Sequence, residues 1–339
     1  MIIPILYFCF DVKINSLKRI AVFTSGGDSP GMNACIRAVV RTAIYNQLEI
    51  FGIYRGYEGM IEGDIVQMNS KSVGNIIQRG GTFLKSTRND EFRTKEGRQK
   101  AFDNLNKNRI EGVVAIGGDG TFTGANIFCK EFDIPFIGIP GTIDNDLMGT
   151  DFTIGYDTAI NTVIQAVDKI RDTANSHNRL FVIEVMGKDA GFIALRSGIG
   201  TGAEAVLVPE TPTYIDELIA KLEKGRRANK TSGIIIIAEG DDTGGAYEVA
   251  KKIKEKFNYY DIRVSILGHM QRGGSPTAID RVLASQLGFE AVNALLNAHK
   301  NKMVGMVDKQ VVFTPFEKAI KHHDQLNPQL LHLVEVLSI

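Results

Sequence analysis

The sequence of 339 residues contains no tryptophan and only three cysteines, which are Cys9, Cys35 and Cys129. The cysteines lie far apart, without the short spacings of a zinc site or of a Cys-x-x-Cys redox motif. The sequence therefore predicts small buried thiols in the reducing environment of the cytoplasm, and it argues against a metal bound by cysteine.

The sequence also lacks an excess of charge of either sign. Lys and Arg together number 39, Asp and Glu together number 39, and the formal net charge is zero. This balance argues against a protein whose overall charge attracts it to nucleic acid or to a membrane surface. Any anion must then be bound by a local cluster of residues.

Apolar runs long enough to cross a bilayer are missing from the sequence. The N-terminal run "MIIPILYFCF" is only about ten residues long, where a membrane span needs about 20. It has neither the basic start nor the small-residue cleavage site of a signal peptide. We interpret residues 1–15 as an N-terminal extension outside the fold.

What the sequence does contain is a repeated alternation of apolar strands and amphipathic helices. The clearest helix is predicted over Gly31–Asn46, and a second one should begin with Asp157 as its N-cap. Residues 223–230 look like a surface connection. The strands are expected at 19–24, 49–54, 112–118, 134–140, 180–187, 204–210, 233–240 and 263–269. Near-continuous apolar strands between helices predict an α/β fold with parallel sheets covered on both faces.

Most of these strands end in glycine followed by polar residues. The ends read "TSGGDSPG", "AIGGDGTF", "PGTIDND", "EVMGKDAG", "IAEGDD" and "LGHMQRGGSP". In open α/β sheets ligands bind beyond the carboxyl ends of the strands, and glycine lets the backbone approach a ligand closely. We therefore expect one long cleft built from these loops.

Two of the loops have the context of a phosphate site, because each joins a strand to a helix. They are "TSGGDSPGMN" (24–33) and "IGGDGTF" (116–122), and neither is a Walker P-loop. Asp119 stands alone between glycines, where a hard carboxylate beside phosphates would suit Mg²⁺. A tight strand-to-helix turn and an Asp-Gly turn remain the alternatives.

A third segment, "QRGGTFLKSTR" (78–88), carries Arg79, Lys85 and Arg88. One of these cations could stabilise the charge on a phosphoryl group in transfer. The alternative interpretation is a surface loop of scattered basic residues.

The loop "GIPGTIDNDLMGTD" (138–151) releases three acids after a buried strand. If the loop is extended, Asp144 and Asp146 point the same way, and their mutual repulsion raises the pKa of one of them. Asp151 is explained well enough by a plain turn or cap.

Taken in order, these segments closely resemble those of bacterial ATP-dependent 6-phosphofructokinases, from about Lys18 to beyond Arg281. The resemblance implies transfer of a phosphoryl group from MgATP to fructose 6-phosphate, with Mg²⁺ as cofactor. It implies two three-layer, Rossmann-like domains of the phosphofructokinase type. These would be an ATP-binding domain of residues 16–154 plus about 270–320, and a fructose 6-phosphate-binding domain of residues 155–269 plus about 321–339. It also implies a cytoplasmic homotetramer whose active sites are shared between subunits.

The resemblance also assigns roles to individual residues. Asp144 matches the catalytic base at the sugar 1-hydroxyl, with Thr142, Asp146 and Arg88 as further catalytic residues. Residues matching ATP contacts are Gly27, Arg88, Asn89, Gly118, Asp119, Gly120 and Thr121, with Asp119 associated with magnesium. Residues matching substrate contacts are Thr142, Ile143, Asp144, Arg179, Met186, Gly187, Lys188, Glu239, Arg263, His269, Met270, Gln271 and Arg272, with Arg179 and Arg263 reaching in from a neighbouring subunit.

Gly120 and Gly141 bear on the choice between ATP and pyrophosphate as phosphoryl donor. Pyrophosphate-dependent relatives resemble "GGDD" and "KTIDND" at these places, where this sequence has "GGDG" and "GTIDND". An aspartate or a lysine there would crowd the α-phosphate of a nucleotide, so the two glycines favour ATP.

The sequence departs from the family pattern at Lys188, where arginine is usual, and at Ser70, where an effector arginine is typical. Regulation by ADP or phosphoenolpyruvate is therefore a hypothesis. It depends on five residues that match the family's effector site, which are Arg37, Arg41, Arg171, Gly202 and Glu204.

Three other functions stay open at this stage. One is a pyrophosphate-dependent enzyme, and another is a different kinase, because "GGDGT" also resembles lipid and NAD kinases. The third is a non-catalytic nucleotide sensor. The joint presence of Asp144, Asp119 and Arg88 argues for catalysis.

Overall fold

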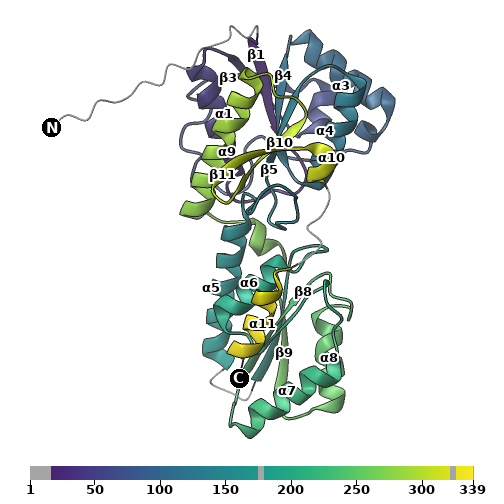
Figure 1. Cartoon of the computed structure of the whole chain (residues 1–339), viewed down its shortest axis with the longest axis vertical. Coiled ribbons are helices and arrows are strands. Elements are labelled where there is room, and N and C mark those ends of the chain that lie inside the picture. Colours follow the sequence, from purple (N-terminus) through teal and green to yellow (C-terminus); the bar gives the residue numbers. More distant parts are fainter. Residues whose placement is uncertain (1–16, 175–178, 321–325, 339) are drawn as a thin grey trace, which may run out of the picture.

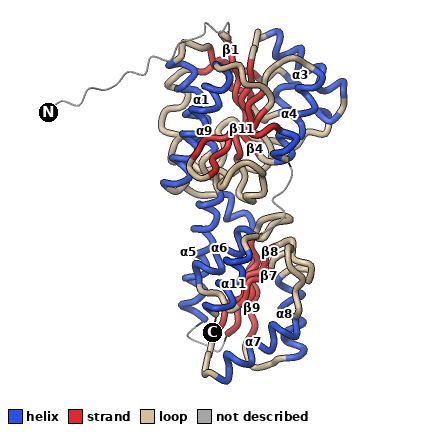
Figure 2. Tube along the Cα trace, viewed as in Figure 1, coloured by secondary structure: helices blue, strands red, loops and turns tan. Residues whose placement is uncertain are grey.

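The computed structural model describes residues 17–174, 179–320 and 326–338, so the predicted extension over residues 1–15 lies outside the described residues. Figure 1 shows two lobes stacked along the long axis of the molecule, with β1 (Arg19–Thr24) in the upper lobe. Each lobe is built around one β-sheet flanked by helices (Figure 2).

Within the described residues, the upper lobe holds a seven-stranded sheet in the order β11-β10-β5-β4-β1-β2-β3. The β2–β3 and β10–β11 pairs at its two edges are antiparallel, and the other pairs are parallel. The strands are β1 (Arg19–Thr24), β2 (Glu49–Ile53), β3 (Ile65–Met68), β4 (Gly112–Gly117), β5 (Phe136–Pro140), β10 (Lys302–Val307) and β11 (Gln310–Pro315).

The lower lobe holds a four-stranded sheet among the described residues, in the order β7-β8-β6-β9. All of its strand pairs are parallel. The strands are β6 (Arg179–Val185), β7 (Ala205–Leu207), β8 (Gly233–Ala238) and β9 (Asp261–Ile266).

Helices cover both faces of each sheet, so each lobe has three layers. On the upper sheet, α1 (Met32–Tyr45) and α9 (Ala278–Leu296) pack on one face, and α2 (Tyr57–Glu62), α3 (Lys95–Lys107), α4 (Asp119–Glu131) and α10 (Phe316–Ala319) pack on the other. On the lower sheet the two layers are α5 (Tyr156–Ala174), α6 (Phe192–Thr201) and α11 (Pro328–Leu337), and α7 (Ile215–Arg227) with α8 (Ala246–Lys256). The short helices η1 (Glu91–Arg93) and η2 (Gly268–Arg272) lie in loops. In the part of the chain that is described, no helix is both long and apolar enough to cross a bilayer.

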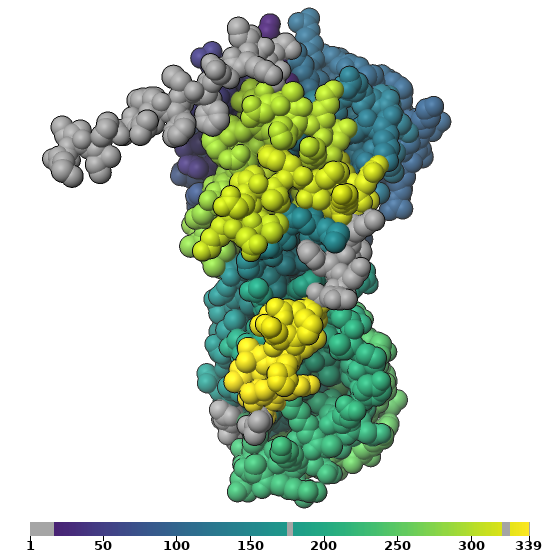
Figure 3. Space-filling model, viewed as in Figure 1, coloured from purple at the N-terminus to yellow at the C-terminus, as the bar shows by residue number. Residues whose placement is uncertain are grey.

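The chain passes between the lobes more than once. After β9 it returns to the upper lobe through α9, β10 and β11, and α11 then packs on the lower lobe (Figure 3). Segments far apart in the sequence thus form one sheet, since β10 pairs with β5 through Lys302 and Ile137.

Most predicted elements are present, and the helix predicted over Gly31–Asn46 differs from α1 by one residue at each end. Two local predictions were wrong. Asp157 lies inside the first turn of α5, which begins at Tyr156, so it is not the N-cap. The segment 223–230 is not wholly a connection, because the buried face of Leu218, Ile219 and Leu222 carries α7 on to Arg227.

The start of α5 is capped by a carboxylate from another helix. Asp280 of α9 is 1 % exposed and accepts hydrogen bonds from the backbone N–H groups of Gly155 and Thr158, both at 2.8 Å. These are donors that the first turn of a helix leaves unpaired. The contact holds the segment between β5 and α5 against α9 of the upper lobe.

We expect Asp280→Ala to lower the free energy of unfolding by about 1–3 kcal/mol, because the N–H groups of Gly155 and Thr158 would be left buried and unpaired. Denaturant unfolding would measure the change. Asp133→Ala removes an exposed ion pair with Lys300 and should change it by less than about 1 kcal/mol. Equal stability of the two variants would contradict the capping role.

Candidate active site

The loops with candidate residues meet between the lobes, at the carboxyl ends of both sheets. In the upper sheet β1 lies between β2 and β4, so the strand order reverses direction between β1 and β4. Such a switch point separates the loops that leave neighbouring strands and is where open α/β sheets bind ligands. The loops after β1 and β4 are the two predicted phosphate loops.

The loop after β1 is in contact with Arg272 of η2. Arg272 donates a hydrogen bond to the carbonyl oxygen of Asp28 at 3.2 Å. A Cβ atom on Gly27 would lie 2.2 Å from Nη1 of Arg272, so only glycine admits this guanidinium at its present position. An arginine that follows the lower sheet is thereby placed against the phosphate loop of the upper sheet.

The loop after β4 ends in the first turn of α4. Asp119 is the first residue of the helix, and its side chain is 40 % exposed. A Cβ atom on Gly120 would meet no atom within 4 Å, so this side of the loop is open. The hydroxyl of Thr121 is buried and has no hydrogen-bond partner among the described residues. An exposed carboxylate, an open helix N-terminus and an unpaired hydroxyl together fit a phosphate group with Mg²⁺.

The acid loop after β5 is buried and not extended. Thr142, Asp144 and Asp146 are 7 %, 8 % and 6 % exposed. Asn145 between the two acids has a φ of +56°, and its side chain accepts a hydrogen bond from the N–H of Thr153 at 2.8 Å. The condition of an extended loop, under which Asp144 and Asp146 would point the same way, is therefore not met, because Asn145 folds the loop into a tight turn.

The surroundings of Asp144 raise its pKa. The pKa of Asp144 is raised from 3.8 to about 6, chiefly by burial and then by the charge of Asp146, while Arg272 and the Thr142 hydroxyl act in the opposite direction. The predicted repulsion between Asp144 and Asp146 thus survives the change of loop conformation. Oδ1 of Asp144 has no hydrogen-bond partner within the described structure. This carboxylate can accept a proton near neutral pH.

The lower sheet supplies the opposite wall of the site. Lys188, after β6, donates its backbone N–H to Glu239, after β8, at 2.7 Å. Its ammonium group lies 3.4 Å from Oδ2 of Asp119 across the lobes. Partial burial lowers the pKa of Lys188, but Asp119, together with Asp146 and Asp189, raises it by more, so the net shift is upward. Lys188 therefore links the candidate sugar side to the candidate metal ligand.

Several of the predicted site residues are buried and support the loops of the site. Ile143 is fully buried in the core, so only its backbone can face a ligand. Gln271 is also fully buried, and its amide accepts the N–H of Met186 and donates to the carbonyl of Gly268. Met186 is 9 % exposed and Gly187 has a φ of +145°, so both shape the turn after β6. His269, by contrast, is exposed beside them.

Arg88 and Asn89 belong to the segment between β3 and α3. Arg88 is exposed, and Asn89 accepts a hydrogen bond from the N–H of Phe92 at 2.9 Å. Met270 of η2 is also exposed, at 60 %.

Two predicted arginines lie away from the rest of the site in this chain. Arg179 begins β6, whose other end leads to Met186, and strands rise by about 3.3 Å per residue. Arg179 and Arg263 both form ion pairs with Asp261, at 3.3 and 2.8 Å. They are thus at the opposite end of the lower sheet from Asp144.

The effector candidates fall into two groups. Arg171 donates to the carbonyl oxygens of Thr201 and Gly202, and Glu204 pairs with Lys230 at 2.9 Å. These residues belong to the lower lobe, whereas the remaining candidates, Arg37 and Arg41, lie on α1 in the upper lobe (Figure 1).

Sequence reasoning missed the residues that hold the phosphate-side loops in place. The side chain of Asn33 donates to the carbonyl oxygens of Arg79 and Gly80 and accepts from the N–H of Phe83 at 2.8 Å. Asn33 lies in the predicted segment "TSGGDSPGMN", but its partners are about 50 residues away, so the sequence carried no signal of this contact.

Comparison with known proteins supports the same interpretation of the site. The family model described as phosphofructokinase matches residues 19–295. The chain belongs to the phosphofructokinase family. It is 54 % identical over 326 residues to ATP-dependent 6-phosphofructokinase 2 of Bacteroides thetaiotaomicron, covering 96 % of this chain and 100 % of the relative. It is 53 % identical over 323 residues to ATP-dependent 6-phosphofructokinase 1 of Thermus thermophilus, covering 95 % and 100 %. The resemblance inferred from the motifs is confirmed.

Solved structures confirm the predicted fold class. Phosphofructokinase from Saccharomyces cerevisiae superposes with a TM-score of 0.85 at 37 % identity, covering 95 % of this chain and 47 % of that chain. A pyrophosphate-dependent phosphofructokinase from Marinobacter aquaeolei has a TM-score of 0.81 at 20 % identity, covering 95 % and 91 %, and shares the fold alone.

Proposed function

We propose that this phosphofructokinase transfers the γ-phosphoryl group of MgATP to the 1-hydroxyl of fructose 6-phosphate, giving fructose 1,6-bisphosphate and ADP. The observation that carries the proposal is the buried Asp144, with a raised pKa and an unpaired oxygen, between the phosphate loops of one lobe and a cation-bearing wall of the other. Three relatives that are 53–55 % identical to this chain are named ATP-dependent 6-phosphofructokinases, which supports the proposal.

Asp144 acts as the general base in this proposal. A pKa of about 6 leaves the carboxylate mostly ionised at pH 7 and still basic enough to take a proton from a hydroxyl. The Thr142 hydroxyl stabilises the turn, because its Oγ1 accepts a hydrogen bond from the backbone N–H of Asp144 at 3.2 Å. Asp146 adds the negative charge that keeps the pKa of Asp144 high.

The upper lobe binds the phosphoryl donor. Gly118 and Gly120 admit the phosphates to the loop after β4, with the Thr121 hydroxyl as a donor to a phosphate oxygen, and Gly27 contacts ATP from the loop after β1. Asp119 would hold Mg²⁺ together with phosphate oxygens, and the metal would neutralise charge on the phosphates. Arg88 and Asn89 complete the donor side, with Arg88 against the transferring group.

The lower lobe binds the sugar phosphate. Arg272 and His269 are the cations for the 6-phosphate, while Met186, Gly187 and Glu239 line the sugar, and Met270 and Gln271 shape the loop that carries the cations. Arg179 and Arg263 lie too far from Asp144 to act in their own chain, which suits a role in the site of a neighbouring subunit. We therefore propose a homotetramer with shared sites.

The domain division follows from this assignment. Residues 16–154 plus about 270–320 would form the ATP-binding domain, and residues 155–269 plus about 321–339 the fructose 6-phosphate-binding domain. We also propose a cytoplasmic location and an effector site for ADP or phosphoenolpyruvate that includes Arg171, Gly202 and Glu204, completed by Arg37 and Arg41 of another subunit.

ATP is the proposed donor mainly because of Gly120. The space beyond its Cα is open, so an aspartate there would put its charge beside the phosphate loops. Gly141 supports ATP as the donor less strongly than the sequence suggested. A Cβ on Gly141 would lie 2.9 Å from Ile116 and 3.2 Å from Met32, so packing alone accounts for this glycine.

The pH dependence of kcat/KM tests the role of Asp144. Asp144 must be ionised to act, so activity should fall as the pH drops through about 6. Asp146→Asn removes a charge that raises the pKa of Asp144, and the acid limb should therefore move to lower pH. The substrate phosphates titrate equally for both enzymes, so the difference between the two profiles belongs to the protein. An unmoved limb, or a move to higher pH, would contradict the assignment.

A second experiment tests the donor site. Gly120→Asp should fold normally, since an acidic residue suits the first turn of α4. We expect its KM for ATP to rise at least about tenfold, from repulsion of the phosphates, with the KM for fructose 6-phosphate within about twofold. Gly120→Ser, which adds bulk without charge, is the matched control. A charged variant that binds ATP as well as the serine variant would refute the placement of the donor.

A further inference from the structure

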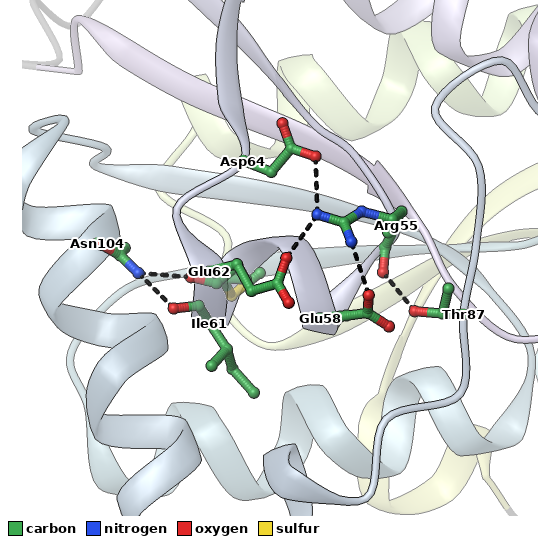
Figure 4. A network of polar contacts seen from close by, with 8 residues as sticks. Arg55, Glu58, Ile61, Glu62, Asp64, Thr87 and Asn104 are labelled. Atoms are coloured by element: carbon green, nitrogen blue, oxygen red, sulfur yellow. Dashed lines mark hydrogen bonds and ion pairs between the residues drawn. The ribbon is translucent and has the colours of Figure 1, made fainter.

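Arg55 lies in the turn between β2 and α2 and is surrounded by acids (Figure 4). Its guanidinium forms ion pairs with Glu58 at 2.8 Å, Glu62 at 2.6 Å and Asp64 at 3.2 Å. The backbone of Arg55 has a φ of +59°, a left-handed conformation that residues with a side chain adopt rarely. Three carboxylates that share one cation hold this residue in a conformation it would otherwise leave.

The strained peptide unit of Arg55 contacts the segment that carries Arg88. The N–H of Arg55 donates to the carbonyl oxygen of Leu84 at 2.8 Å. The hydroxyl of Thr87 donates to the carbonyl oxygen of Arg55 at 2.9 Å (Figure 4). Arg55 thus holds residues 84 and 87 from one side. Arg88 follows directly in the chain.

The same segment is held from its other side by the strand and loop of β1. The hydroxyl of Thr24 donates to the carbonyl of Lys85 at 2.9 Å, and that of Ser86 donates to the carbonyl of Gly26 at 2.8 Å. The segment is therefore fixed between the phosphate loop and Arg55. Every hydrogen bond just described ends at residue 87 or before it, and the side chain of Arg88 is exposed.

We propose that Arg55 and Thr87 are positioning residues that aim Arg88 at the phosphoryl group, through the bond from the Thr87 hydroxyl to the Arg55 carbonyl. The inference rests on the role proposed above for Arg88. Without the guanidinium, Glu58, Glu62 and Asp64 repel one another and the turn relaxes to an ordinary φ. The carbonyl of Arg55 then rotates away from Thr87.

The ion pairs act here on conformation more than on stability. Isolated exposed pairs contribute little to the free energy of unfolding. A displacement of about 1 Å in a group that contacts the reacting atoms, by contrast, can cost about a hundredfold in rate. The effect should therefore appear in kcat and not in the melting temperature.

The experiment begins with Thr87→Val, which keeps the shape of the side chain and removes its hydrogen bond. We expect kcat to fall about fivefold, the scale of one hydrogen bond, with the KM for fructose 6-phosphate within about twofold. Thr87→Ser restores the hydroxyl and should restore most of the rate. Arg55→Met should reproduce the loss. Lys100→Met is the matched control, because it removes a nearby exposed ion pair, with Glu91 at 2.8 Å, and should leave kcat unchanged.

A double-mutant cycle with Arg88→Ala then separates positioning from a general structural effect. If Thr87 acts through Arg88, adding Thr87→Val to Arg88→Ala should change kcat by less than about twofold. A fivefold fall in that background, an unaffected kcat in Thr87→Val itself, or a lower melting temperature that accounts for the loss would each overturn the inference. Full activity of Arg88→Ala would instead refute the proposed role of Arg88, whatever the result at Thr87.

Discussion

Removal of the Asp144 carboxylate from water is the interaction on which the proposed chemistry depends. Its pKa is raised to about 6, chiefly by burial and then by the neighbouring charge of Asp146. Arg272 and the Thr142 hydroxyl oppose it, so the group is still ionised at neutral pH. The pKa is set by groups from both lobes, because Asp144 follows β5 of the upper sheet and Arg272 follows β9 of the lower one. The relative position of the lobes is thus part of the chemistry.

Several contacts fix that relative position. Asp280 caps α5 from the upper lobe, Lys188 reaches Asp119, and Arg272 bonds to the loop that contains Gly27. The path of the chain adds to this, since within the described residues it passes to the lower lobe after β5 and returns to the upper lobe after β9. The fold therefore does more than present loops. These contacts hold the loops at the carboxyl ends of the upper sheet against the loops at the carboxyl ends of the lower sheet.

Much of this arrangement could be predicted from the sequence, because continuous apolar strands alternate with amphipathic helices and glycine marks the strand ends. The apolar stripe of α1 and the two phosphate loops were visible in this way. What could not be predicted were contacts between distant residues. Asn145 turns the acid loop because Thr153 holds its side chain, and Asp280 replaces Asp157 as the cap. The antiparallel edges of the upper sheet were not predicted, because β3 has one buried residue and β11 has none, so neither shows the continuous apolar run of the central strands. Gly141 looked like a determinant of the donor, but its Cα faces packed side chains.

The most direct test of the account is product formation from fructose 6-phosphate with MgATP and, separately, with magnesium pyrophosphate, by the unmodified protein and by Asp144→Ser. We expect fructose 1,6-bisphosphate with MgATP, little or none with pyrophosphate, and a rate about a hundredfold or more lower in the variant, the usual scale for loss of a general base. Comparable rates with the two donors would contradict the assignment of ATP, and equal rates for the two proteins would contradict Asp144 as the base.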